Sequence, residues 1–259
     1  RLKARRALAA LFEDARGVTM KFGQLMAGGE DDPLAKLVGG VDARPLSDMM
    51  PVIEQELDRP AMDVFESIEE STAAASLGQV HKARLKDGTT VAIKIQYPAI
   101  KDAVEAEMTL FGLMPSVGPV DKWGFDLGGY KSALKKNMDR ELDYRDEAIR
   151  QEQFRSKVDV PGLIVSRVFT EFSARRILVQ EWQEGVSLNG VARWSDDDRN
   201  SVARTLLATL LHSLFVAGEV HGDPNPGNFM FKKHPKGGAS VVLVDFGCTV
   251  PVAREKRLA

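Results

Sequence analysis

The residue types that could do chemistry gather in two short motifs near the end of the chain. Residues 221–228 read H-G-D-P-N-P-G-N, and Asp245 begins the sequence D-F-G 17 residues after Asn228. An Asp and an Asn five residues apart, followed by a second Asp in D-F-G, form an arrangement in which one Asp orients an attacking hydroxyl and the other two residues hold Mg²⁺. Carboxylate and amide oxygens are ligands that Mg²⁺ prefers. We therefore predict that Asp223 is catalytic and that Asn228 and Asp245 bind a metal ion.

A lysine on a predicted strand supplies positive charge for the phosphates of a nucleotide. Residues 90–96 alternate, so that Ala92 and Lys94 share one face and three β-branched residues share the other. The preceding turn at residues 86–88, K-D-G, predicts a hairpin that pairs this strand with residues 78–85. We predict that Lys94 reaches the α and β phosphates and that Ala92 lines the nucleotide cleft.

An alanine-rich segment, residues 73–81, occupies the place of a glycine-rich phosphate loop. Ala73 and Ala75 stand at the first two glycine positions of the G-x-G-x-x-G-x-V frame, and Gly78 keeps the third. Alanine restricts φ and adds a methyl group where backbone would approach phosphate, so we expect a stiffer and differently placed loop. The residues predicted to contact nucleotide here are Ala73, Ala74, Ala75, Ser76, Gly78 and Val80.

With these motifs the chain resembles the UbiB/ABC1/ADCK family of atypical kinases. The resemblance is carried by the alanine-rich segment, by K-F-G-Q at residues 21–24, and by E-L-D-Y at residues 141–144 before Glu147. It extends from about Val18 to Cys248, with five motifs in the family's order. The resemblance implies an α+β, two-lobed protein-kinase-like fold with an N-terminal helical extension that carries the KxGQ motif.

The resemblance also implies roles that spacing alone does not assign. Glu147 would pair with Lys94 and fix it toward the phosphates, whereas spacing does not choose among the carboxylates of this region. Lys21 and Gln24 would be part of the active site and would cover the acceptor side of the cleft. The alternative for Lys21 is a solvent-facing position on an amphipathic helix.

We expect three regions along the chain. They are an N-terminal helical extension over residues 1–60, a kinase-like N-lobe over 61–180 with inserted helices at 101–158, and a kinase-like C-lobe over 181–259 that we expect to be truncated. A hinge at residues 180–185 would join the lobes, with backbone groups around Glu181 and Gln183 meeting adenine.

Hydrophobic periodicity predicts the larger elements. We expect a helix over 101–114, one long charged helix from 130 to about 158, and strands over 163–168 and 176–181 as the last two of the small lobe. A further helix should begin after the cap Ser195 and end at Gly218, with a buried stripe of Val202, Leu206, Leu210 and Leu214.

Composition excludes several classes of protein. The chain of 259 residues is 44% hydrophobic with a net charge of −2, which gives no bias toward nucleic acid, and we expect no nucleic-acid partner. Its single cysteine, Cys248, excludes an internal disulfide and favours a reducing, cytoplasmic location. No apolar run reaches the roughly 18 residues that a membrane span needs.

The first 21 residues are basic, with six Lys or Arg against Glu13 and Asp14. A basic amphipathic helix there would give peripheral contact with a membrane surface, and a solvated helix with one face on the core explains the pattern equally well. The choice between these two stays open.

The function predicted from these residues is an atypical kinase or ATPase that binds Mg²⁺ and ATP or ADP. The resemblance links such proteins to ubiquinone and other isoprenoid lipids, which makes a lipid or isoprenoid small molecule a candidate partner. One alternative is a phosphotransferase similar to aminoglycoside or choline kinases, since H-G-D-x-x-x-x-N occurs there too. Another is a nucleotide-gated scaffold with negligible turnover.

Overall fold

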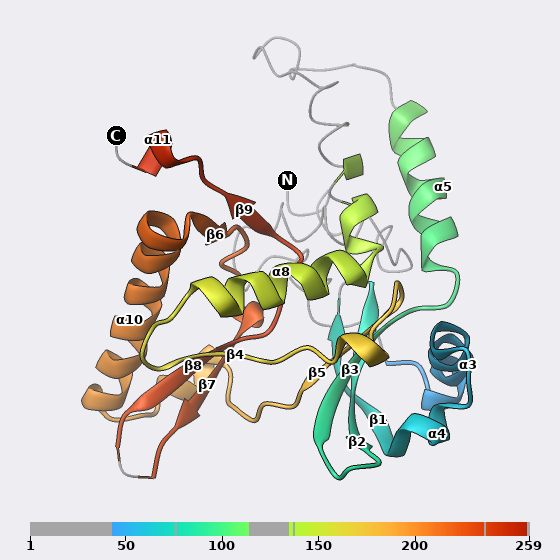
Figure 1. Ribbon diagram of the computed structural model, residues 1–259, viewed down its shortest axis with the longest axis horizontal. Helices are drawn as coiled ribbons and strands as arrows, with labels where there is room; N and C mark the ends of the chain where they lie inside the picture. The colour runs from blue at the N-terminus through green and yellow to red at the C-terminus, as the bar shows by residue number, and fades with distance from the viewer. Residues whose placement is uncertain (1–42, 76, 114–134, 137, 236, 258–259) are drawn as a thin grey trace, which may run out of the picture. The chain divides into compact units, whose positions relative to one another are not determined.

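The structure is a computed structural model that describes residues 43–75, 77–113, 135–136, 138–235 and 237–257 (Figure 1). The chain forms two compact units. Within the described residues, the first unit contains residues up to Gly88, 93–143 and 175–177, and the second contains 89–92, 144–174 and 178 onward. Both helices and strands are present, in agreement with the α+β class.

A four-stranded sheet has the order β1-β2-β3-β5 and consists of β1 (Phe65–Ala75), β2 (Gly78–Leu85), β3 (Thr90–Gln96) and β5 (Ile177–Glu181). The predicted strands at 78–85 and 90–96 are confirmed, and Gly88 between them has the positive φ of 87° that a tight turn requires. Strand β1 was not expected, because three register shifts against β2 interrupt its alternation of polar and apolar residues.

Helices α3 (Leu46–Leu57) and α4 (Ala61–Val64) precede the sheet in the first unit. Met49, Val52 and Ile53 of α3 are spaced by three and four residues and are buried, so one face of this helix contributes to the core. Helix α5 (Ile100–Leu113) matches the predicted helix to within one residue at each end.

The charged region after α5 is not one long helix, and that prediction is wrong. Its described helical residues end at Glu141, Leu142 and Asp143 are not helical, and α8 begins afresh (Tyr144–Lys157). The amide N–H of Asp143 donates to the carbonyl of Arg140 at 3.1 Å, a tighter turn than an α-helix makes. The break also marks the boundary between the two units. Charged residues lie on both sides of it, and their pattern does not indicate where a helix ends.

The second unit contains two small sheets. A three-stranded sheet has the order β4-β8-β7, and an antiparallel pair joins β6 to β9; their bounds are β4 (Leu163–Val165), β6 (Glu219–His221), β7 (Phe229–Lys233), β8 (Ala239–Leu243) and β9 (Thr249–Pro251). The expectation that 163–168 forms one strand of the small lobe is wrong for residues 163–165, because β4 pairs in parallel with β8. Val168, at the end of the segment, makes a single antiparallel bridge with Gln180 of β5. Short apolar strands do not encode which sheet they join.

The shorter helical elements of the second unit are η2 (Thr170–Phe172), α9 (Leu188–Val191), η4 (Pro226–Asn228) and α11 (Arg254–Arg257). Helix α10 (Asp196–Leu211) begins at the predicted cap, where the Ser195 hydroxyl accepts a hydrogen bond from the amide of Asp198 at 3.3 Å. It continues into a π-helical stretch, η3 (His212–Ala217), and ends at Gly218 with φ 69°, as predicted.

The predicted buried stripe of α10 is correct only in its first half. Val202 is buried and Leu206 packs beside it against Phe231 and Val241 of the β7–β8 hairpin. Leu210 is 51% exposed and Leu214 is half-buried. In the described part of the chain, no helix is both long and apolar enough to span a membrane.

Candidate functional site

The β7–β8 hairpin brings two predicted metal ligands to the same end of one sheet. Its last antiparallel pair is Phe229 with Leu243, and the amide of Val244 then donates to the carbonyl of Asn228 at 3.1 Å. Asn228 therefore lies immediately before β7 at the point where Asp245 follows β8. Both side chains are half-buried, as a ligand site open to solvent requires.

Hydrogen bonds within the loop fix the positions of Asp223 and Asn228. The side-chain amide nitrogen of Asn228 donates to the carbonyl of Asp223 at 3.1 Å, and the amide of Asn225 donates to the Asp223 carboxylate at 3.3 Å. A further bond joins the Asn225 side chain to the amide of Gly227 at 3.0 Å. Because the Asn228 nitrogen is used on the loop, the amide oxygen, the atom that a metal ion needs, lies on the other side of the planar group.

The D-F-G segment is held by the loop before it. His221 Nε2 lies 2.6 Å from the carbonyl oxygen of Asp245, and since a carbonyl can only accept, this nitrogen carries the proton. The amide of Gly247 donates to Asp245 Oδ1 at 2.9 Å, and the amide of Gly222 donates to the carbonyl of Cys248 at 2.6 Å. His221 therefore braces the backbone of a predicted metal ligand.

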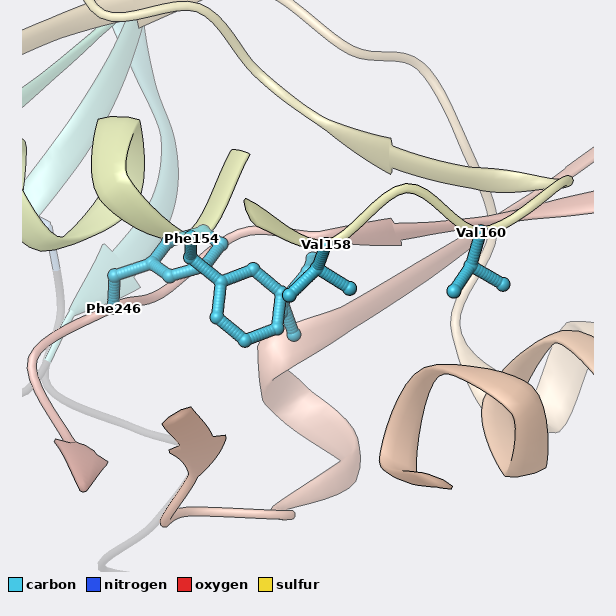
Figure 2. Close-up of a cluster of buried hydrophobic side chains, with 5 residues drawn as sticks. Phe154, Val158, Val160 and Phe246 are labelled. Atoms are coloured by element: carbon cyan, nitrogen blue, oxygen red, sulfur yellow. The ribbon is translucent and has the colours of Figure 1, made fainter. Parts of the chain in front are cut away.

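Helix α8 contacts the D-F-G segment through its side chains. The amide of Phe246 lies 3.4 Å from a Glu147 carboxylate oxygen, and the guanidinium of Arg150 donates to the carbonyl of Gly247 at 2.9 Å. Phe246 is fully buried against Phe154, with ring centroids 5.4 Å apart, and Figure 2 shows these two rings in contact within one apolar cluster. Arg150 was missed in the sequence, where it is one of many charges on this helix.

Lys94 and Glu147, predicted to form a pair, are both buried. Lys94 is 7% exposed on β3 and Glu147 is 4% exposed on α8, and buried charges require partners. They belong to different units, and their pairing stays a prediction. Ala92 on β3 is buried as well.

The alanine-rich segment is not the loop that the sequence suggested. Ala73, Ala74 and Ala75 belong to strand β1, paired with Val80, Gln79 and Gly78 of β2. Only positions 76 and 77 lie between the strands, and Ser76 falls outside the described residues. Alanine favours this outcome over a mobile glycine loop because it restricts φ to values that a strand can use.

Gly78 is required by packing as well as by any nucleotide contact. A Cβ atom built there would lie 2.8 Å from the carbonyl carbon of Ile95 and 3.0 Å from Cα of Gln96. Both obstacles are backbone, which cannot move aside without disturbing β3. Val80, also predicted to contact nucleotide, is half-buried on β2.

Strand β2 of this hairpin carries a buried polar cluster that the sequence did not reveal, formed by Gln79 and His81. Both side chains are fully buried, and their nitrogens Nε2 are 2.8 Å apart. His81 Nδ1 donates to the carbonyl of Glu69 at 2.8 Å, while Gln79 bonds both the amide and the carbonyl of Arg44 at 2.9 Å. Burial lowers the pKa of His81, against smaller opposing effects from the Glu69 carbonyl and the Glu70 charge.

The remaining predicted site residues divide between described and undescribed parts of the chain. Glu181 ends β5, where its amide donates to the carbonyl of Arg167 at 2.9 Å, and Gln183 is half-buried just beyond it. Lys21 and Gln24 lie outside the described residues, as does the basic segment expected at a membrane surface. Among described residues, no group of three or more His, Cys, Asp or Glu side chains is arranged to hold a metal ion.

Comparisons with known proteins point in the same direction as the motifs. The profile of the ABC1 atypical kinase-like domain matches residues 36–259. AarF domain-containing protein kinase 1 of Xenopus laevis is 31% identical over 90% of this chain and 47% of its own length. Atypical kinase COQ8B, mitochondrial, of Rattus norvegicus is 33% identical over 90% of this chain and 46% of its own length. The chain thus spans less than half the length of these curated relatives.

A solved structure, that of Rv3197 with erythromycin from Mycobacterium tuberculosis, aligns with a TM-score of 0.63 and 30% identity. The alignment covers 96% of this chain and 65% of that one. Together with the matching profile, it confirms the protein-kinase-like α+β fold and the resemblance to the UbiB/ABC1/ADCK family that the motifs indicated. The KxGQ extension itself lies outside the described residues.

Proposed function

Because this chain belongs to the ABC1 atypical kinase-like domain family, we propose that it binds an adenine nucleotide with Mg²⁺ and transfers or hydrolyses its terminal phosphoryl group. The observation that carries the proposal is the hairpin register that sets Asn228 and Asp245 at one end of the β7–β8 sheet. Their carboxylate and amide oxygens suit a hard divalent cation.

Each residue of the site has a role in this proposal. Asn228 and Asp245 hold the metal ion, and Asp223 orients the hydroxyl or water that attacks. Lys94, a buried residue, contacts the α and β phosphates, and a charge interaction in a site shielded from water is stronger than one in bulk solvent. Mg²⁺, when bound, neutralises charge on the phosphate oxygens.

A thermal-shift titration with ATP or ADP and Mg²⁺ tests the proposal. Ligand near 100 times its dissociation constant should raise the melting temperature of the parent by about 5 °C or more. Asp245→Asn and Asn228→Ala should lose most of this shift, because each removes an oxygen ligand or its charge. Asp197→Asn, an exposed carboxylate at the start of α10, is the matched control and should keep it. An equal shift in Asp245→Asn would remove Asp245 as a metal ligand.

Turnover measurements distinguish the activities that this site could have. Phosphate release without an acceptor would make the chain an ATPase, and transfer to an added small alcohol would favour the phosphotransferase alternative. Binding without either would leave a nucleotide-gated scaffold. The alanine-rich β1 segment disfavours the aminoglycoside- or choline-kinase-like alternative.

We also propose that the acceptor or partner is an isoprenoid lipid. The support is family membership and the coenzyme Q-related names of curated relatives such as COQ8B. Stimulation of nucleotide turnover by a short-chain ubiquinone precursor, compared with a saturated alcohol of equal length, would test this. Equal stimulation by both compounds would argue against it.

A further inference from the structure

One face of α8 presents three side chains to the D-F-G segment. Glu147, Arg150 and Phe154 follow one another at intervals of three and four residues, which places them on the same side of the helix. The Glu147 carboxylate accepts a hydrogen bond from the amide of Phe246. The ring of Phe154 packs on the ring of Phe246 (Figure 2). Arg150 contacts the next peptide group, at Gly247.

Gly247 connects Arg150 to the predicted metal ligand. Its carbonyl accepts from Arg150 Nη1 at 2.9 Å, and its amide donates to Asp245 Oδ1 at 2.9 Å. The second terminal nitrogen of Arg150 lies 3.2 Å from Asp146 Oδ2, and the Arg150 side chain is only 17% exposed. A continuous series of contacts thus extends from Asp146 through Arg150 and Gly247 to the carboxylate of Asp245.

The segment needs such support because it has no strand ladder of its own. Strand β8 ends at Leu243 and β9 begins at Thr249, so Asp245 and its neighbours lie in the connection between them. Backbone groups outside a ladder must be satisfied by side chains or water. A bond from a charged donor is stronger than a neutral one, and a half-buried guanidinium holds its geometry well.

We infer that Arg150 is a positioning residue for metal binding: by holding the carbonyl of Gly247, it fixes the peptide whose amide orients the Asp245 carboxylate. This inference rests on the proposed function, since it assigns Asp245 to a metal ion. The two nitrogens of the guanidinium fork contact Asp146 and Gly247 at once, which a lysine cannot reproduce with the same geometry.

The first test measures the magnesium dependence of ATP binding in the full chain. Arg150→Met should weaken binding in the presence of Mg²⁺ by about tenfold, the effect typical of removing a residue that orients a metal ligand. Binding in EDTA should stay at the parental value, a difference that a general structural defect would not produce. Arg150→Lys should fall between parent and Arg150→Met. Arg155→Met is the control, because Arg155 on the same helix contacts Glu152 instead of the D-F-G segment.

The second test needs no nucleotide. Cys248 directly follows Gly247 and is the single cysteine of the chain, so its alkylation by iodoacetamide reports on this segment alone. Arg150→Met should raise the alkylation rate severalfold, because the Gly247 carbonyl is no longer held, and Arg155→Met should leave it unchanged. If Arg150→Met does not fold, Arg150→Lys and Asp146→Asn take its place, with smaller increases expected in the same order.

The outcomes separate this inference from the proposed function. Parental magnesium dependence and parental alkylation rate in Arg150→Met would overturn the inference while leaving nucleotide binding intact. Absence of any nucleotide binding by the parent would overturn the proposed function, and with it the metal role of Arg150. In that case, faster alkylation of Cys248 in Arg150→Met would show only that Arg150 holds the Gly247 backbone in place.

Discussion

The D-F-G end of the β7–β8 hairpin and the tip of the β1–β2 hairpin are both predicted to contact nucleotide, but they are held in different ways. At the first, side chains of α8 and of His221 bond directly to backbone atoms outside the strands. At the second, Ala73 to Ala75 are paired in a strand, and Gly78 packs against the backbone of Ile95. At the D-F-G end, side chains from other elements hold backbone that is outside a strand ladder. At the tip of the β1–β2 hairpin, short-range bonds such as that from the Thr72 hydroxyl to the Val80 carbonyl at 3.1 Å add to strand pairing and to the close backbone packing at Gly78.

The difference predicts which substitutions each region tolerates. A segment held by side chains should tolerate a small added group but lose function when a donor is removed. A closely packed hairpin should be insensitive to distant charges but intolerant of a single methyl group. The glycines of the two regions test this contrast directly.

The largest effect is expected from Gly78→Ala. The added Cβ would collide with the carbonyl group of Ile95, so we expect a loss of about 3 kcal/mol or more in the free energy of unfolding. Gly222→Ala, whose Cβ would meet the Cys248 and Val250 side chains at 3.0 Å and the Cys248 carbonyl oxygen at 3.2 Å, should cost about 1–2 kcal/mol, since the two nearest groups are side chains that can shift. Gly227→Ala, with a nearest contact of 3.4 Å, should stay within about 0.5 kcal/mol of the parent.

Urea unfolding of the three variants measures this order. Equal stabilities of Gly78→Ala and Gly227→Ala would show that β2 can withdraw from β3, and the proposed contrast between the regions would be lost. A large loss in Gly227→Ala would instead show that the loop at residues 221–228 is as closely packed as the β1–β2 hairpin.

The next effect concerns pH and the Gln79–His81 cluster. In neutral His81, Nδ1 donates to the Glu69 carbonyl and Nε2 accepts a hydrogen bond from the side-chain nitrogen of Gln79. Protonation of Nε2 would place its N–H group opposite the N–H group of Gln79, and the hydrogen bond between them would be lost. Burial lowers the pKa of folded His81 below its ordinary value near 6.5, and the unfolded chain therefore binds more protons below that pH. Stability should be complete above about pH 6.5 and fall as pH decreases, by up to about 1.4 kcal/mol per pH unit.

Unfolding free energies of the parent and of His81→Gln between pH 7.5 and 5.5 give the comparison. The variant should be less stable than the parent at high pH and should show a flatter dependence on pH. If both proteins lose stability equally as pH falls, another group is responsible, and His81 does not need to be neutral in the folded state.

The sequence predicted which residues would lie near one another in the candidate site, because these residues are close together along the chain. Asp223, Asn228 and Asp245 are placed by one loop and one hairpin, which together span fewer than 25 residues. The cap Ser195 and the left-handed Gly218 are local signals too, and both were found where predicted.

The errors arose where distant partners decide the structure. Residues 163–165 pair with β8, almost 80 positions away, and nothing in three apolar residues indicates that choice. The helix break at Leu142 coincides with a boundary between units and lies in uniformly charged sequence. The Arg150 contact with Gly247 joins residues separated by 97 positions, and pattern alone did not distinguish Arg150 from neighbouring charges.

The smallest effect is expected from Ala75→Gly at the β1–β2 tip. Glycine in a paired strand should cost about 0.5–1 kcal/mol of stability. The greater backbone freedom should also shift the relative affinity for ATP and ADP by more than about 0.5 kcal/mol. Ala83→Gly, a buried position farther along β2, is the control and should lose stability without a change in nucleotide preference. If Ala75→Gly leaves the relative affinity for ATP and ADP unchanged, the tip of this hairpin does not contribute to nucleotide recognition.

Calorimetric titration of ATP into the parent and into Asp245→Asn, each with Mg²⁺ and with EDTA, tests the proposed metal–nucleotide site most directly. The parent should bind ATP more tightly with Mg²⁺ than with EDTA, and Asp245→Asn should reduce that gain by more than about tenfold because a charged oxygen ligand is lost. The same magnesium gain in both proteins, or no ATP binding by the parent, would contradict the assignment of Asn228 and Asp245 as the metal site of a nucleotide-binding kinase.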